Sequence, residues 1–242
     1  MIRTLLFYVA LVVSTLVHGT PSIVAGLLGY RRRGIHDWGL RGWGRWILAA
    51  AGTPVVMEGT ERIPRDAPVV FASNHSSMFD IWALGSSLPG SVRFVAKAEL
   101  TRIPFFGRAM LSQEHVSIDR VNKVRAIEAY DRAAVTIKGG ISTIVFPEGT
   151  RSRTGELLPF KNAPFGLAIV AQVPVVPVYV HDTFEILPKG GWQIRPRPIR
   201  ILIGEPIATT GLSLDDRQRL RDQVFAAIAL LRRRVDSGAS VT

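Results

Sequence analysis

The amino-acid sequence predicts an α/β fold in which helices flank a mostly parallel central sheet, preceded by an N-terminal, membrane-associated helical hairpin. Short apolar segments alternate with longer segments of helical periodicity, an order typical of parallel sheets covered by helices. The first 28 residues are strongly apolar, and 242 residues are enough for one large domain with an appendage. We therefore expect membrane-anchoring residues 1–50 and an α/β domain over residues 51–242.

The first apolar stretch predicts two short helices. It runs from Leu5 to Val17, is interrupted by His18-Gly19-Thr20-Pro21, and resumes from Ile23 to Leu28. A bilayer span takes about 20 predominantly apolar residues, and glycine and proline near the middle indicate a break. We therefore expect a hairpin that enters one leaflet. A cleaved signal peptide is the alternative, but the segment that follows would then lose its apolar partner.

That following segment is rich in arginine and tryptophan. Tryptophan prefers the headgroup level of a membrane, and arginine there attracts anionic lipid. The pattern predicts an interfacial segment, with a buried helix carrying solvated arginines as the alternative. The residues are Arg31, Arg32, Arg33, Trp38, Arg41, Trp43, Arg45 and Trp46.

Seven short segments rich in valine and isoleucine predict the strands. They comprise residues 55–57, 69–73, 92–96, 115–118, 141–146, 175–180 and 199–203. Helical periodicity predicts helices over residues 121–138 and 162–172. Ser213 and Asp216 have the spacing of a capping box at the start of a last helix, whose apolar stripe includes Leu220, Val224 and Leu231.

The composition favours anionic partners. The chain has 30 lysines and arginines against 19 acidic residues, a formal charge of +11, which suits phospholipid, nucleic acid or an acidic carrier protein. The arginines beyond residue 190 are dispersed and no nucleic-acid-binding motif accompanies them. We therefore expect a membrane surface as partner and no nucleic acid.

A first polar cluster, with His75 and Asp80, follows a predicted strand, where active sites of open α/β sheets form. Histidine suits a general base, and a carboxylate on one ring nitrogen leaves the other free to accept a proton. Five residues apart on one helix the two side chains would diverge. We therefore expect His75 in a turn and Asp80 in the first helical turn, with Ser76 or Ser77 as the cap. A purely structural histidine is the alternative.

A second cluster, Glu148-Gly149-Thr150-Arg151, follows another predicted strand. Arginine donates two parallel hydrogen bonds to a phosphate, and glycine lets backbone N–H groups approach it closely. The cluster predicts a phosphate-binding turn. An ordinary turn with a solvated arginine is the alternative.

Four blocks of the chain, in this order, resemble the glycerolipid acyltransferase family. They are residues 74–80, 97–107, 146–152 and 173–177. Within that family the chain is similar to the bacterial 1-acyl-sn-glycerol-3-phosphate acyltransferases, also called lysophosphatidic acid acyltransferases. The resemblance covers most of residues 70–180.

The resemblance implies transfer of an acyl group from acyl-coenzyme A or acyl carrier protein to the sn-2 hydroxyl of lysophosphatidic acid, giving phosphatidic acid. His75 would remove the hydroxyl proton, and Asp80 would orient His75. Residues 148–151 would bind the acceptor, and Lys97 would contact substrate or oxyanion. A thioester is already activated, so no metal or organic cofactor is expected. Such donors are cytosolic, which implies the cytoplasmic face of the inner membrane.

Two positions depart from the family pattern. The family commonly has a glycine two positions beyond the lysine of Phe160-Lys161, where this chain reads Asn162-Ala163-Pro164, and Gln172 also stands where the family frequently has glycine. The sequence therefore leaves the acceptor open between lysophosphatidic acid and another lysolipid, for example lyso-ornithine lipid. A lipid-binding scaffold that has the fold without turnover is the non-enzymatic alternative.

Overall fold

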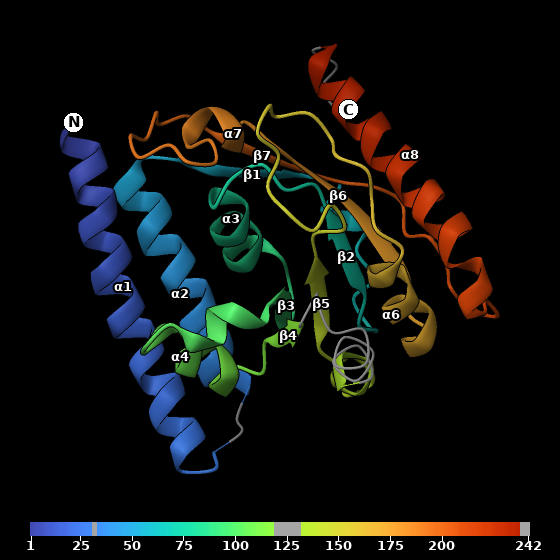
Figure 1. Cartoon of the computed structure of the whole chain (residues 1–242), viewed down its shortest axis with the longest axis horizontal. Coiled ribbons are helices and arrows are strands. Elements are labelled where there is room, and N and C mark those ends of the chain that lie inside the picture. The colour runs from blue at the N-terminus through green and yellow to red at the C-terminus, as the bar shows by residue number, and fades with distance from the viewer. Residues whose placement is uncertain (31–32, 119–131, 238–242) are drawn as a thin grey trace.

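The computed structural model describes residues 1–30, 33–118 and 132–237. These residues form one sheet between two groups of helices (Figure 1). The sheet has the strand order β1-β7-β6-β2-β5-β3-β4, and every neighbouring pair is parallel except β6 and β7. The predicted α/β fold with a mostly parallel sheet is confirmed.

All seven predicted strands are present, with bounds shifted by one residue at most. They are β1 (Val55–Glu58), β2 (Val70–Ser73), β3 (Val92–Lys97), β4 (Val116–Ile118), β5 (Ser142–Val145), β6 (Val175–His181) and β7 (Ile199–Ile203). Valine and isoleucine supply about half of their residues, because β-branched side chains pack well on a pleated surface.

The helices include those predicted after His75, over residues 162–172 and at the end of the chain, and two short ones that were not predicted, α4 (Phe106–Ser112) and α7 (Thr183–Ile186). The predicted ones are α3 (Phe79–Ser87), α6 (Ala163–Ala171) and α8 (Arg217–Asp236), in that order, and the 3-10 turns are η1 (Thr60–Arg62), η2 (Ala98–Arg102) and η3 (Leu214–Asp216). The Ser213–Asp216 capping box is present and precedes α8. Of the predicted helix 121–138, residues 132–138 are helical, and residues 121–131 lie outside the described residues.

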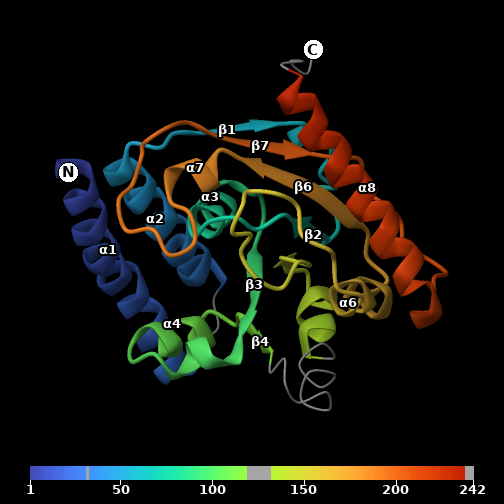
Figure 2. The ribbon, with the colours of Figure 1, turned by 45° about the horizontal axis from the view of Figure 1, so that its top comes forward.

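Each face of the sheet has its own apolar core. Phe71 of β2 lies in the core that α2 and α3 complete, and its neighbours Val70 and Ala72 lie in the core that α6 and α8 complete. Successive side chains of a strand point to opposite faces, so β2 is buried on both (Figure 2). Such double burial explains why the strand sequences are apolar runs without alternation.

The N-terminal prediction of two short helices within residues 5–28 is wrong. α1 (Ile2–Leu27) is one helix that continues through Pro21, and α2 (Arg33–Ala51) packs antiparallel beside it (Figure 1). The hairpin therefore consists of α1 and α2. Proline removes one helical hydrogen bond, but packing at this level holds the helix: an ideal Cβ on Gly19 would lie 2.8 Å from the Phe105 ring, so the glycine marks a close helix contact.

Within the predicted arginine and tryptophan segment, Arg31 and Arg32 lie outside the described residues, and the residues from Arg33 to Trp46 belong to α2, which has two different faces. Trp43 packs against Trp82 of the core, and its Nε1 donates to Thr15 Oγ1. Trp38 and Trp46 both contact the buried His18 ring, yet each is 51% exposed. Among the described helices, α1 alone is long and apolar enough to cross a membrane, judged by length and composition.

Candidate active site

Three adjacent parallel strands, β2, β5 and β3, bring the candidate residues together. Their carboxyl ends lie at the same edge of the sheet. His75 follows β2, the segment 146–151 follows β5, and Lys97 ends β3. Sequence-distant clusters therefore meet because parallel pairing sets their strands side by side.

His75 and Asp80 are in direct contact. The His75 Nδ1–H donates to Asp80 Oδ2 over 2.8 Å, with His75 in the turn and Asp80 in the first turn of α3, as the spacing predicted. A carboxylate at Nδ1 leaves Nε2 as the proton acceptor. His75 lines a cavity, and its Nε2 makes no hydrogen bond to the described residues.

Asp80 is fully buried, and every hydrogen bond to its carboxylate comes from a donor. Oδ2 also accepts from the backbone N–H groups of Ser76 (2.8 Å) and Ser77 (2.9 Å), while Oδ1 accepts from the Thr183 hydroxyl at 2.5 Å. The expected serine cap is present in part, since Ser77 Oγ accepts from Phe79 N at 3.3 Å although the N-cap residue is Met78. These donors offset the desolvation of a buried carboxylate.

The turn that carries His75 is held from three sides. Asn74 bonds both backbone groups of Val180 on the neighbouring β6, and Ser152 N donates to the His75 carbonyl. The His75 ring stacks on the Phe146 ring with centroids 3.9 Å apart. The imidazole therefore has one orientation, which general-base catalysis requires.

Glu148 lies behind His75 and not in the cavity. Its side chain is 3% exposed, and Oε1 accepts from the His75 backbone N–H at 3.0 Å. Burial is the main reason that the pKa of Glu148 rises to about 8, so the carboxyl is neutral near pH 7. This placement differs from the substrate contact that the family pattern implied for Glu148.

The rest of the second cluster does reach the cavity. Gly149 has a φ of +74°, a conformation that strains other residues, and this turn presents Thr150 and Arg151 to the cavity. Lys97 lines the same cavity from the end of β3. The structure therefore brings together His75, Arg151 and Lys97 as the sequence predicted.

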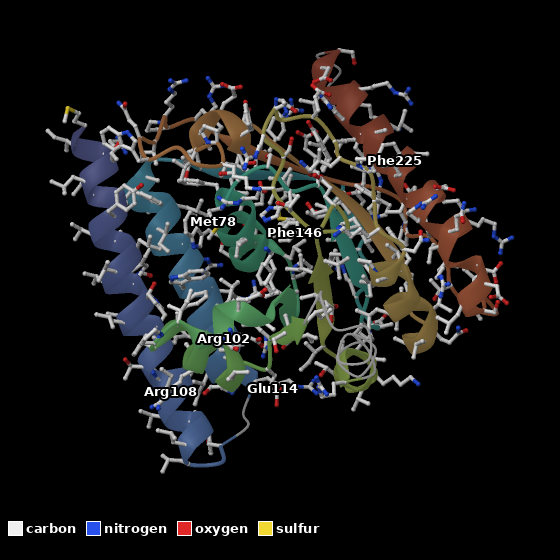
Figure 3. All side chains as sticks on the ribbon, in the orientation of Figure 1. Met78, Arg102, Arg108, Glu114, Phe146 and Phe225 are labelled. Carbon is white, nitrogen blue, oxygen red and sulfur yellow. The ribbon has the colours of Figure 1, made fainter. Side chains whose placement is uncertain are left out.

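A cavity of about 420 Å³ extends from His75 between the sheet edge and the N-terminal helices. Its walls are largely apolar, and Met78 and Phe146 lie in them near the centre of the molecule (Figure 3). Further apolar wall residues are Leu40, Trp43, Ile81, Phe94, Leu100, Phe106 and Met110. The sequence did not predict that α1, α2 and α4 form this wall, since those contacts are long-range.

The polar groups farther along the cavity bond to one another. His115 Nδ1 accepts from Phe94 N, and its Nε2 donates to Gln113 Oε1. Gln113 Nε2 in turn donates to Ser22 Oγ of α1. Burial lowers the pKa of His115 to about 3, which keeps the ring neutral. Gln113 and His115 therefore line the cavity with their hydrogen bonds made to other protein groups.

Two site residues escaped the sequence reasoning. Thr183, which anchors Asp80, starts α7 about a hundred residues after it. Lys189 lines the cavity from the loop after α7, and its Nζ donates to Thr150 Oγ1 at 2.9 Å. The Pro188-Lys189-Gly190-Gly191 stretch reads as an ordinary turn in the sequence, so only the folded chain reveals its place.

Comparisons with known proteins agree with this geometry. The family model described as Acyltransferase matches residues 54–181. Proteins called 1-acyl-sn-glycerol-3-phosphate acyltransferase are similar: one from Cocos nucifera is 32% identical over 86% of this chain and 67% of its own, and one from Pseudomonas aeruginosa is 32% identical over 87% and 82%. The crystal structure of the 1-acyl-sn-glycerophosphate (LPA) acyltransferase PlsC from Thermotoga maritima superimposes with a TM-score of 0.80 at 30% identity, covering 99% of this chain and 96% of that one.

Proposed function

Because this chain belongs to the acyltransferase family, we propose that it transfers a fatty acyl group from an acyl thioester to the sn-2 hydroxyl of 1-acyl-sn-glycerol-3-phosphate, giving phosphatidic acid. The observation that carries the proposal is His75. Its Nδ1 is held by a buried carboxylate, and the ring lines an apolar cavity that also contains cationic side chains. The names of the relatives support lysophosphatidic acid as the acceptor.

The proposed reaction is a direct attack. The acceptor hydroxyl oxygen attacks the thioester carbonyl carbon while His75 Nε2 takes its proton. The tetrahedral oxyanion then collapses, the carbon–sulfur bond breaks, and the proton passes from His75 to the leaving thiolate. A covalent acyl-serine is disfavoured, because Ser76 Oγ is bonded to Thr183 Oγ1 and Ser77 Oγ donates to the Leu187 carbonyl.

The cavity suggests how the substrates are arranged. Acyl chains gain free energy when they leave water, so we assign the apolar wall to acyl binding. Arg151 and Lys97 are assigned to anionic groups at the reacting end. We assign Glu148 to positioning, since it holds the His75 backbone N–H. The donor is acyl-coenzyme A or acyl carrier protein, and no metal or organic cofactor takes part in the proposed reaction.

We place the enzyme on the cytoplasmic face of the inner membrane. Many apolar side chains of α1 are exposed, among them Leu5 (66%), Val9 (53%) and Val12 (60%). Such a surface is typical of a membrane-facing helix. Thr15, His18 and Gly19 of the same helix line the cavity, so lipid substrates would enter beside the bilayer.

A thioester-release assay tests the reaction. Detergent-solubilised protein is given acyl-coenzyme A or acyl carrier protein with lysophosphatidic acid or a panel of other lysolipids. We expect turnover with lysophosphatidic acid that His75→Ala lowers at least about a hundredfold, while His181→Ala, a histidine outside the cavity, leaves it unchanged. Full turnover in His75→Ala would refute the assignment of the base, and no turnover with any pair would favour the scaffold alternative.

The same assay decides between acceptors. The two departures from the family pattern lie at the ends of α6: Asn162-Ala163-Pro164 at its start and Gln172 at its C-cap, where φ is +55°. A left-handed C-cap explains why glycine is frequent there. Neither segment lines the cavity, which favours lysophosphatidic acid over another lysolipid. Turnover only with another lysolipid would refute lysophosphatidic acid as the acceptor, although the proposed mechanism would still hold.

A further inference from the structure

We propose that Lys189 is a specificity-determining residue of the acceptor site and binds the phosphate of the lysolipid together with Arg151 and Lys97. This inference rests on the proposed function and adds a residue from outside the four family blocks. Lys189, Arg151 and Lys97 line one cavity with His75, although they come from three separate segments of the chain.

The charges around the cavity point to an anion. None of its described lining residues is an aspartate or glutamate, whereas three carry a positive side chain. Lys97, Arg151 and Lys189 make no ion pair with the described residues. Glu148 is behind His75 and neutral near pH 7, because burial raises its pKa to about 8. Clustered cations without a counter-ion are stabilised by an anionic ligand.

Lys189 is placed to share a phosphate with the Gly149–Arg151 turn. Its Nζ already donates to Thr150 Oγ1 at 2.9 Å, so it lies within hydrogen-bond reach of that turn. An ammonium has three donors, and one such bond leaves others for phosphate oxygens. A phosphate held between this turn and Lys189 would keep the glycerol backbone near His75.

The loop that carries Lys189, residues 187–195, is anchored at both ends. On the site side the Leu187 carbonyl accepts from Ser77 Oγ at 2.7 Å. On the other side Tyr8 OH of α1 donates to the Trp192 carbonyl, and Ile194 N donates to Thr4 Oγ1. Figure 2 shows this orange segment passing from α7 toward α1. Anchoring at both ends restricts where Lys189 can reach, which favours binding over free solvation.

Lys189→Met tests the inference because it keeps the length of the side chain and removes its charge. We expect the KM for lysophosphatidic acid to rise about tenfold or more, the loss expected for a charge-assisted hydrogen bond. We expect kcat to stay within about threefold and Lys189→Arg to recover most of the affinity. The matched control is Lys138→Met, an exposed lysine outside the cavity, which should change neither constant.

Each other result has a defined meaning. An unchanged acceptor KM would overturn the inference. A rise in the KM for acyl-coenzyme A alone would also overturn it, because the cation would then serve the phosphates of the donor. A lower melting temperature with kcat lost and no rescue by arginine would indicate a structural role and overturn it as well.

A binding measurement separates this inference from the proposed function. Glycerol 3-phosphate is titrated into solubilised wild-type and Lys189→Met protein by calorimetry, without any turnover. Affinity lowered about tenfold or more in the variant would support the phosphate site even if lysophosphatidic acid proved not to be the acceptor. Equal affinities would overturn the site even if the acylation of lysophosphatidic acid were established.

Discussion

Asp80 shows how single atoms set the chemistry of this protein. Both carboxylate oxygens are buried and accept hydrogen bonds only, from two backbone N–H groups, the Thr183 hydroxyl and His75. The same carboxylate therefore organises the start of α3 and selects the tautomer of His75. Because Asp80 does both, even a side chain of the same shape in its place would change how His75 acts as a base.

Asp80→Asn is expected to lower kcat by about a hundredfold or more while the protein stays folded. The amide preserves the shape of the side chain, but it no longer favours the tautomer with the proton on Nδ1. The measurement is steady-state turnover, with thermal unfolding as the control for folding. A kcat within a few-fold of wild type would show that Asp80 does not orient His75.

Glu148 adds a pH dependence of stability. Burial raises the pKa of its carboxyl to about 8, against an ordinary value of 4.5. Between these values the folded protein retains a proton that the unfolded chain releases, so the free energy of unfolding falls as the pH rises from 4.5 to 8 and then levels off. The group thus favours the folded state most strongly at the acidic end of that window.

Glu148→Gln should make stability less sensitive to pH, because glutamine does not ionise yet still accepts from the His75 N–H. The melting temperature of wild type is expected to fall more between pH 5.5 and 8 than that of Glu148→Gln. Glu148→Ala should lower kcat, since the His75 backbone loses its acceptor. Parallel melting curves for wild type and Glu148→Gln would contradict the raised pKa.

At the scale of elements, the α1–α2 hairpin depends on glycines that permit close approach. Gly39 faces the His18 carbonyl, where an added Cβ would lie at 2.9 Å, and an ideal Cβ on Gly42 would overlap the His18 ring. His18 is itself buried and held by Ser14. The hairpin is therefore a packed pair of helices that also forms a wall of the active-site cavity.

Gly42→Ala and Gly34→Ala form a matched pair on α2. Gly42→Ala should destabilise the protein by about 1–3 kcal/mol through overpacking against His18. Gly34 is exposed with nothing within 4 Å of an ideal Cβ, so Gly34→Ala should stabilise it by about 0.5–1 kcal/mol. Thermal unfolding in detergent measures both, and a neutral Gly42→Ala would contradict the close packing.

The whole molecule is asymmetric. The N-terminal hairpin lies on one side of the sheet and α8 on the other (Figure 1). Exposed apolar residues concentrate on α1. The exposed Arg108 lies on α4, which packs against α1, and the exposed Arg102 lies on η2, which packs against α4 (Figure 3). An apolar face beside basic residues is suited to an anionic bilayer.

Membrane binding should accordingly depend on α1. Replacing Leu5, Val12 and Leu16 together by glutamine is expected to weaken binding to vesicles with anionic lipid at least about a hundredfold, because each apolar side chain contributes about 1.5–3 kcal/mol when buried. Cosedimentation measures this. The control is Val135→Gln, at an exposed apolar residue far from α1 in the sequence. Equal sedimentation of wild type, the triple variant and Val135→Gln would contradict the proposed binding of the membrane by α1.

Local sequence determined the strands, the capped last helix and the contact between His75 and Asp80. Each depends on neighbours in the chain: apolar β-branched runs form strands, Ser213 and Asp216 cap their own turn, and a turn joins His75 to the helix of Asp80. Residues 148–151 were found because they directly follow such a strand, whereas Lys97 was found through the resemblance to the family.

Tertiary structure alone decided the rest. Pro21 stays inside one helix because α2 and α4 pack at that level, which local propensity does not encode. Glu148 turned away from the cavity because His75, 73 residues before it, offers a buried N–H. Thr183 and Lys189 lie in the site because β6, which precedes them, pairs with β2, and because the loop that carries Lys189 is anchored. Contacts between distant segments form only when the apolar faces of a sheet and its helices are buried together, so no local sequence pattern predicts them.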